Sequence, residues 1–364
     1  MPARYILEQQ ILDPHPQVEI TEERFHCLMR AGATLTDARA LEQGYELMLG
    51  NFMDMEMAFS RIGLSATLEF DHQYASLAQI LREANRQVVN VLTAIRSYVD
   101  QAPQLFKALD LKPDFALTVR KALNDMHAGS ADYRFVYALR NFVQHQGSAV
   151  QGFEGADGPK VDSNAWADGV RLLAFKNQLG TADFRADVRA EQPDKINIRQ
   201  RLRMSMEALG TVHLALRELV ASHVDAARAV FEAAIRDYRA AEPPGIVALY
   251  ARAELDPALS VLIILEWDEV RLSLVRKNCQ PARLWPKRSR GQPEPAALVA
   301  LRVAAKHTVR QAAGAVCVSE EQWGDWEAGL PMPEGLFILY QLQTDLHPTH
   351  RVERKLDAQA GSAA

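Results

Sequence analysis

Residues 74–99 restrict the fold more than any other part of the sequence. Their apolar side chains recur every three to four positions, and neither Gly nor Pro interrupts them. Because an α-helix has about 3.6 residues per turn, this spacing gathers the apolar side chains on one face. Residues 37–62 and 195–240 show the same pattern. The sequence therefore predicts a mainly α protein built around a helical bundle.

Signals for strands are fewer and surround the helical stretches. Residues 3–12 predict a short strand, and Thr21 is the predicted N-cap of a helix that begins at Glu22. Residues 170–175 and 184–188 alternate like two strands, which predicts a small β-hairpin inserted between bundle helices.

Two further regions complete the secondary-structure prediction. Residues 147–164 are rich in glycine and predict a loop. Residues 256–278 have a helical pattern, and the apolar run 261–265 within them fits either a buried strand or a buried helix turn.

Length and composition indicate a soluble globular protein. With 364 residues, of which 48% are hydrophobic, the chain is long enough for about two domains. We expect an N-terminal extension (1–20), a helical bundle (21–240), a helical and Pro-rich connector (241–293), a second helical domain (294–346) and a tail (347–364).

Charge and cysteine content limit the classes of partner. The net charge of −5 provides no overall attraction for nucleic acid, so such contacts must come from local clusters. Three widely separated cysteines without metal-ligand spacing indicate reduced thiols in a cytoplasmic protein. No apolar run reaches membrane-spanning length. We expect no membrane association.

Neither a metal nor a cofactor is expected. The glycine-containing run 155–160 lacks the Lys-Ser/Thr ending of a phosphate-binding loop. His347 and His350 have a ligand-like spacing but lie beside Arg351 in a Pro-containing tail, which disfavours a metal there.

Residues 133–145 predict a helix with two different faces. Its large apolar side chains fall on one arc of the helical wheel, and Gly147 is expected to end the helix. Arg140 and His145 lie about 140° apart, with polar side chains between them. The polar face is made of Tyr137, Arg140, Asn141, Gln144 and His145.

This face resembles the HEPN family, whose helical bundles carry Arg, often Asn, and then His a few residues later. Here the matching residues are Arg140, Asn141 and His145. The bare Arg-to-His pattern recurs three times elsewhere in the chain, but only this copy has Asn directly after Arg. The resemblance implies a homodimer and a metal-independent endoribonuclease of toxin or defence type, with an antitoxin or regulatory protein as a further partner.

The resemblance also implies roles for individual residues. His145 would move a proton of the RNA substrate, Arg140 would hold the phosphate, and Asn141 would assist. Tyr137 and Gln144 would line the substrate cleft. The alternative is that these side chains form only a solvated or interface surface and that His145 is a residue favoured at a helix end.

Residues 296–345 resemble an Xre-type helix-turn-helix. Helices are expected at 296–306, 309–316 and 320–328, followed by another at 336–342. Ser319 is the expected cap of the third helix, which ends in Trp-Glu-Ala-Gly. The resemblance implies DNA as a partner and contacts from Arg310, Gln311, Glu321 and Gln322.

The sequence also allows two other functions for the whole chain. It could be a DNA-binding transcriptional regulator whose bundle only dimerises, or both of its domains could bind proteins. The second is suggested by the acids Glu320, Glu321 and Asp325 on the expected recognition helix, since acids repel phosphate.

Two residue clusters allow structural and functional interpretations. Arg199, Arg201 and Arg203 form either an RNA-facing basic patch or a solvated helix face. The methionines between positions 48 and 57 are expected in the core or in dimer packing.

Overall fold

The computed structural model divides the chain into two compact units, residues 1–283 and 284–364. No helix among the described residues is long and apolar enough to cross a membrane. The structure describes residues 4–9, 16–69, 73–109, 111, 113–155, 170–180, 184–241, 248–282, 293, 295–327 and 332–347.

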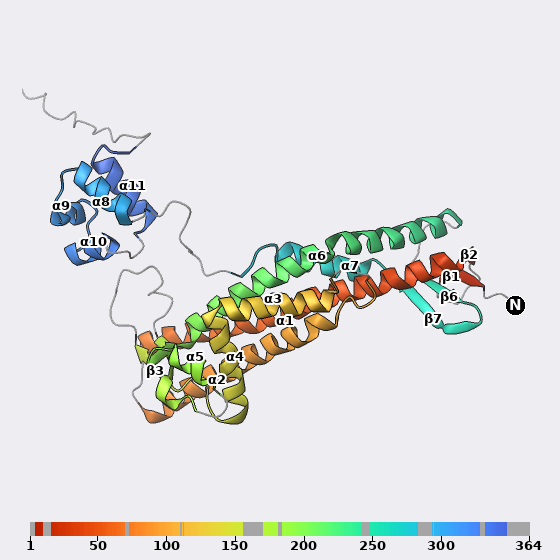
Figure 1. Ribbon diagram of the computed structural model, residues 1–364, viewed down its shortest axis with the longest axis horizontal. Helices are drawn as coiled ribbons and strands as arrows, with labels where there is room; N and C mark the ends of the chain where they lie inside the picture. Colours follow the sequence, from red (N-terminus) through yellow and green to blue (C-terminus); the bar gives the residue numbers. More distant parts are fainter. Residues whose placement is uncertain are drawn as a thin grey trace, which may run out of the picture. The chain divides into compact units, whose positions relative to one another are not determined.

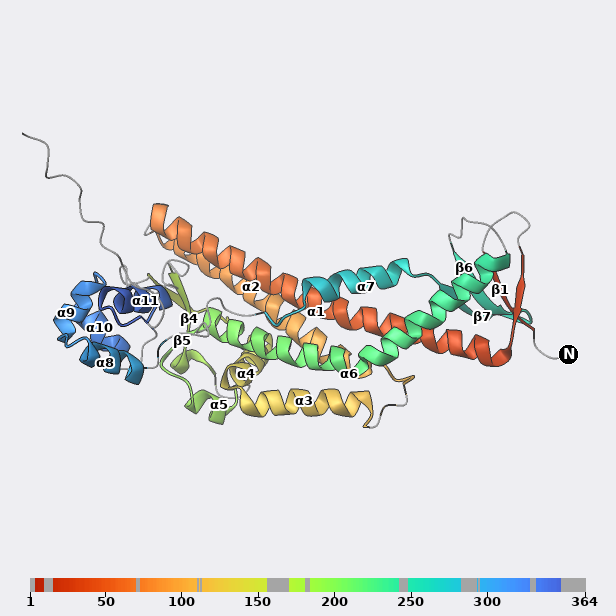
Figure 2. The same ribbon diagram turned by 90° about the horizontal axis from the view of Figure 1, so that it is seen from above.

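Two long helices, α1 (Glu22–Glu69) and α6 (Ile198–Ala241), form the frame of the first unit (Figures 1 and 2). The first, α1, is 48 residues long and therefore about 70 Å in length. It packs on α2 (Tyr74–Gln101), α6 and α7 (Glu266–Lys277). Gly32 of α1 allows close approach to Val261, which lies in a strand rather than in one of these helices, because a Cβ at position 32 would lie 2.6 Å from a methyl carbon of Val261.

The remaining helices of this unit are shorter. The turn η1 (Ala102–Gln104) follows α2, and α3 (Phe115–Gly129) leads into α4 (Ala131–His145). The turn η2 (Lys176–Gln178) and α5 (Ala186–Ala190) precede α6.

A four-stranded antiparallel sheet joins distant parts of the chain at one end of the first unit (Figure 2). Its order is β2 (Val18–Ile20), β1 (Tyr5–Gln9), β6 (Leu249–Ala253) and β7 (Asp256–Ile263). The strand predicted within 3–12 is thus confirmed. Residues 5–9, expected in an N-terminal extension, pair in this sheet with residues 249–253, expected in a connector.

A three-stranded antiparallel sheet lies toward the opposite end of this unit (Figure 2). Its central strand is β4 (Val170–Phe175), between β3 (Gly152–Gly155) and β5 (Lys195–Asn197). The predicted hairpin is therefore only partly correct. The strand expected at 170–175 is confirmed as β4, but most of its expected partner, 184–188, lies in the helix α5. Phe184 and Val188 are both buried at a four-residue spacing, which suits a helix as well as an alternating strand.

Two helix predictions also need correction. Residues 256–263 are strand rather than helix, so the strand alternative is right for Val261–Ile263. The helix expected over 37–62 is part of the continuous α1, which begins at Glu22 as predicted. Its cap is Thr21, whose Oγ1 accepts a hydrogen bond from the Arg24 amide at 3.2 Å.

The second unit has its own core. It contains α8 (Pro295–Ala304), α9 (Val309–Ala315), α10 (Glu320–Glu327) and α11 (Glu334–Gln343). Trp323 packs edge-on against Tyr340 with ring centroids 4.7 Å apart. The predicted cap is confirmed, because Ser319 Oγ accepts a hydrogen bond from the Gln322 amide at 3.1 Å.

Candidate functional site

Helix α4 has the two faces that its sequence predicts. Ser130 caps it, with Oγ accepting a hydrogen bond from the Tyr133 amide at 3.1 Å. Phe135, Leu139 and Phe142 are buried in the main core, whereas His145 in the last turn is exposed. The chain therefore fixes the orientation of the polar side chains through the packing of the apolar ones.

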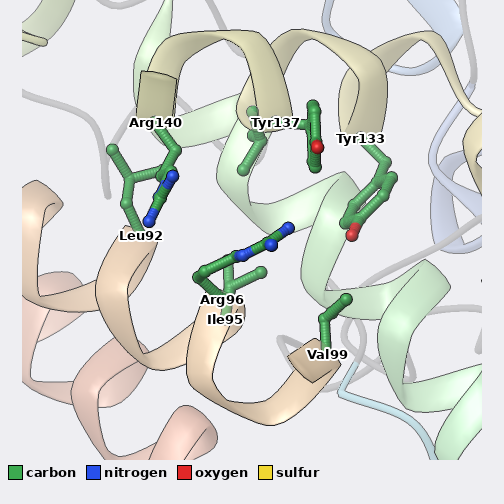
Figure 3. Close-up of a pocket in the computed structure, with 8 residues that line it drawn as sticks. Leu92, Ile95, Arg96, Val99, Tyr133, Tyr137 and Arg140 are labelled. Carbon is green, nitrogen blue, oxygen red and sulfur yellow. The ribbon is translucent and has the colours of Figure 1, made fainter. Parts of the chain in front are cut away.

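A narrow pocket lies between α2 and α4 (Figure 3). Its volume of about 20 Å³ is room for one water molecule rather than for a substrate. Arg96 enters it from α2, and Arg140 and Tyr137 enter it from α4. The rest of the lining is formed by Leu92, Ile95, Val99, Tyr133 and Val136.

The two guanidinium groups have different surroundings. Arg96 donates to Asp100 at 2.7 Å and lies 6.0 Å from the centroid of the Tyr137 ring. Arg140 Nη1 donates to Asn141 Oδ1 at 3.2 Å, but the buried Arg140 Nε has no hydrogen-bond acceptor among the described residues. A buried donor without a partner costs free energy, so this position favours an incoming acceptor.

The predicted site residues do not form one bonded cluster. Arg140 and Asn141 are joined by a hydrogen bond, and Tyr137 shares the pocket with Arg140. Gln144 and His145 are exposed in the last turn, outside that pocket. No hydrogen bond or ion pair joins His145 to Arg140 within the described part of the chain. They lie about 7.5 Å apart along the helix axis.

A buried polar network in the first unit was not expected from the sequence. Arg217 Nε and Nη2 each donate to Glu42 at 2.7 Å, and His213 Nε2 lies 3.2 Å from Glu42 Oε2. His213 Nδ1 is 2.9 Å from the hydroxyl of Tyr98, and its ring stacks on Tyr45 with centroids 4.0 Å apart. The network therefore connects α1, α2 and α6.

The protonation of this network follows from its burial and hydrogen bonds. Burial lowers the pKa of His213, and the hydrogen bond to Glu42 opposes that shift without overcoming it. Burial raises the pKa of Glu42, but hydrogen bonds from His213 and Arg217 outweigh this and leave it lowered. We therefore assign a neutral imidazole beside a charged carboxylate. The only sequence signal is the four-residue spacing of His213 and Arg217. Arg217 also begins one of the other Arg-to-His patterns, which ends at His223 rather than His213.

Neither interpretation of the arginines at the start of α6 is right. Arg199 and Arg203 both donate to Glu56, with distances from 2.7 to 2.9 Å. Arg201 Nη1 donates to Asp132 at 2.6 Å. These side chains are largely buried ion-pair partners that attach α6 to α1 and α4, so they form neither an RNA-facing patch nor a solvated face.

The residues expected to contact DNA have mixed surroundings. Arg310 is exposed, and its Nε lies 3.7 Å from Glu320. The Gln311 side chain accepts a hydrogen bond from the Thr308 amide in a capping box, so it is occupied within α9. Glu321 is exposed and Gln322 is half-buried. The surface of α10 is therefore acidic, as its sequence predicts.

A salt bridge also reduces the free positive charge of this unit. Arg302 donates to both carboxylate oxygens of Glu327, at 2.6 and 2.9 Å. Within the described ranges, no cluster of three or more His, Cys, Asp or Glu side chains could hold a metal ion. His350 of the tail lies outside them.

Comparisons with known proteins identify no relative. No family model, curated protein or solved structure matches the chain.

Proposed function

We propose that the α4 face binds RNA and cleaves it without a metal ion, as a toxin or defence effector would. The observation that carries this proposal is the buried Arg140 Nε, which has no acceptor among the described residues and shares a pocket with the Arg96 guanidinium. The Arg140 guanidinium, together with Arg96, which is paired with Asp100, favours a phosphate oxygen at the pocket mouth, and a small shift of Arg140 would let its Nε donate to that oxygen. Because the pocket itself admits only a water-sized group, the nucleotide would lie over α4 rather than inside the bundle.

The exposed His145 supplies the chemical group for cleavage. Its imidazole would take the proton of a ribose 2′-hydroxyl as the 2′-oxygen attacks the neighbouring phosphorus. The bond from phosphorus to the 5′-oxygen then breaks, and the leaving oxygen takes a proton from water. Arg140 would stabilise the charge that develops on the phosphate. The expected products are a 2′,3′-cyclic phosphate and a 5′-hydroxyl.

Cleavage of a labelled mixed RNA pool in EDTA tests this proposal. The wild type should produce cyclic phosphate ends, and His145→Ala should lose the activity while it keeps its helical content. His223→Ala is a matched control, since His223 is an exposed histidine on α6. Equal activity of the His145 variant and the wild type, or a folded wild type without activity, would contradict the nuclease proposal.

A DNA-binding transcriptional regulator is the second candidate. It is favoured by the arrangement of α9 and α10, two short helices joined by a four-residue connection (316–319) around a separate core. A screen of duplex DNA tests it, and Arg310→Gln or Gln322→Ala should then reduce binding. The exposed acids of α10 oppose phosphate contact, so we rank this function below RNA cleavage.

A further inference from the structure

Helix α1 carries an apolar stripe on the side turned away from its core. Met53, Met57 and Leu64 are 52%, 60% and 61% exposed. Met48 and Met55, by contrast, are fully buried, so the methionine cluster divides between the core and the surface. On the helical wheel, the stripe lies about 140° from the core positions. Large apolar side chains gathered on one exposed face indicate an interaction surface.

The spacing of this stripe is that of a coiled-coil seam. Gly50, Met53, Met57, Ser60 and Leu64 alternate at intervals of three and four residues, as the a and d positions of a heptad do. They extend for about 21 Å. A Cβ at Gly50 would meet nothing within 4 Å, so the backbone is open to a partner there.

We infer that this seam binds the same seam of a second copy of the chain in antiparallel orientation. Asp54 follows the seam residue Met53, and Arg61 follows the seam residue Ser60. The two charged residues therefore occupy the same heptad position, seven residues apart. An antiparallel pairing places Asp54 of each copy opposite Arg61 of the other. Around a twofold axis both pairs form at once, so the surface is complementary to itself.

The charges along the seam favour an antiparallel second copy over a parallel one. Asp54 is exposed and pairs with no residue that the structure describes, and Arg61 reaches only Glu83, at 3.7 Å. A parallel pairing would instead place Asp54 opposite Leu49 and Arg61 opposite Glu56. Glu56 is already bound by Arg199 and Arg203, so the parallel arrangement satisfies neither charge.

A groove of about 340 Å³ beside the seam enlarges the surface. Asp54, Met57 and Arg61 line it from α1, and Glu83, Arg86 and Asn90 line it from α2. Long side chains of the second copy can enter this groove beside the seam. The surface is separate from the α4 face, whose pairing the family resemblance implies, so this inference does not depend on RNA cleavage.

Disulfide cross-linking of the full-length chain tests the orientation. In a background with the exposed Cys279 and Cys317 changed to Ser, Met53→Cys and Leu64→Cys are made as separate variants. Antiparallel seams place position 53 opposite position 64, so a mixture should form the mixed dimer on oxidation. Each variant alone should not, because identical positions lie about 16 Å apart. Homotypic disulfides with no mixed dimer would overturn the inference.

Sedimentation of the uncross-linked protein tests the surface itself. Met57→Glu should abolish the dimer, whereas Leu47→Glu should not, since Leu47 is equally exposed at 60% but lies about 80° from Met57 on the wheel. Asp54→Arg should weaken dimerisation by about tenfold, because the twofold axis makes the substitution remove two Asp54–Arg61 ion pairs at once. Adding Arg61→Asp should restore it. A wild type that remains monomeric at roughly 100 μM, or equal effects at positions 47 and 57, would refute the proposal.

Discussion

Arg217 binds the carboxylate of Glu42 through two hydrogen bonds of 2.7 Å, in a site where the Glu42 side chain is only 2% exposed. Arg217 also reaches beyond this pair, since its Nη1 donates to the carbonyl of Asn278 at 2.9 Å. Asn278 follows α7 and binds Glu46 of α1 through its side chain. The pair therefore connects the middle of α1 to α6 and to the end of α7.

Removing one partner of this pair should strongly destabilise the first unit. Glu42→Ala leaves the charged Arg217 and the buried His213 without their acceptor, and we expect a loss of about 3–5 kcal/mol in the free energy of unfolding. Urea unfolding followed by circular dichroism measures it. Glu46→Ala is the control, because that carboxylate is more exposed and should cost less. Equal losses in the two variants would contradict the assigned importance of Glu42.

The buried imidazole of His213 should make stability depend on pH. Burial lowers its pKa from the ordinary value of 6.5, so the folded state binds fewer protons than the unfolded state as the solution becomes acidic. The free energy of unfolding should therefore fall as the pH drops below about 6.5, and the lowered pKa of Glu42 extends this loss to lower pH.

Urea titrations from about pH 7.5 to 5.5 measure that slope. His213→Gln should reduce it, although the variant is also less stable at neutral pH. His223→Gln replaces an exposed histidine on the same helix and should leave the slope as it is in the wild type. An unchanged slope in His213→Gln would show that other groups cause the pH dependence.

If RNA binds the α4 face, Arg96 should contribute a phosphate contact. Arg96→Gln is expected to weaken RNA binding and to reduce the dependence of log K on log salt by about 0.7, the change expected for one contact to single-stranded RNA. Filter binding at several salt concentrations measures both quantities. Arg82→Gln removes an exposed arginine of the same helix outside the pocket, so a similar reduction there would indicate nonspecific attraction.

Glu327 should be important for the stability of the second unit. Besides Arg302, it accepts a hydrogen bond from Trp323 Nε1 at 2.7 Å. Glu327→Ala removes the acceptor of Trp323 Nε1 and of Arg302 Nε and Nη2, and we expect a loss of about 1–3 kcal/mol in the free energy of unfolding of this unit. Tryptophan fluorescence during denaturation follows the transition. Glu320→Ala, which removes only an exposed carboxylate 3.7 Å from Arg310, should have little effect.

Local sequence signals predicted most of the helices and two of their N-caps. The periodic apolar residues of 74–99 correspond to α2, and both predicted caps, Thr21 and Ser319, accept the expected backbone hydrogen bonds. The two faces of α4 also follow from its sequence. These features depend on residues within a few turns of each other, so they can be inferred without the rest of the chain.

Polar side chains were predicted less well when their partners are distant in sequence. Arg199 and Arg203 have the pattern of a basic surface, but Glu56 of α1 approaches them only in the folded chain. Likewise, nothing near Glu42 indicates that it meets His213 and Arg217. The sequence singled out Arg140 for its chemistry, but only the packing of α4 on α2 placed Arg96 beside it and left its Nε without an acceptor.

The sequence by itself therefore determined a mainly helical protein, the position of most helices, their caps and their apolar faces. The tertiary structure decided which strands pair, as in the sheet that joins residues 5–9 to 249–253, and which charges are buried. The physical reason is that helix hydrogen bonds and caps are local. The pairing of β1 with β6 and the buried ion pairs of Glu42 and Glu56 join residues more than a hundred positions apart, and their geometry is set only when the whole core packs.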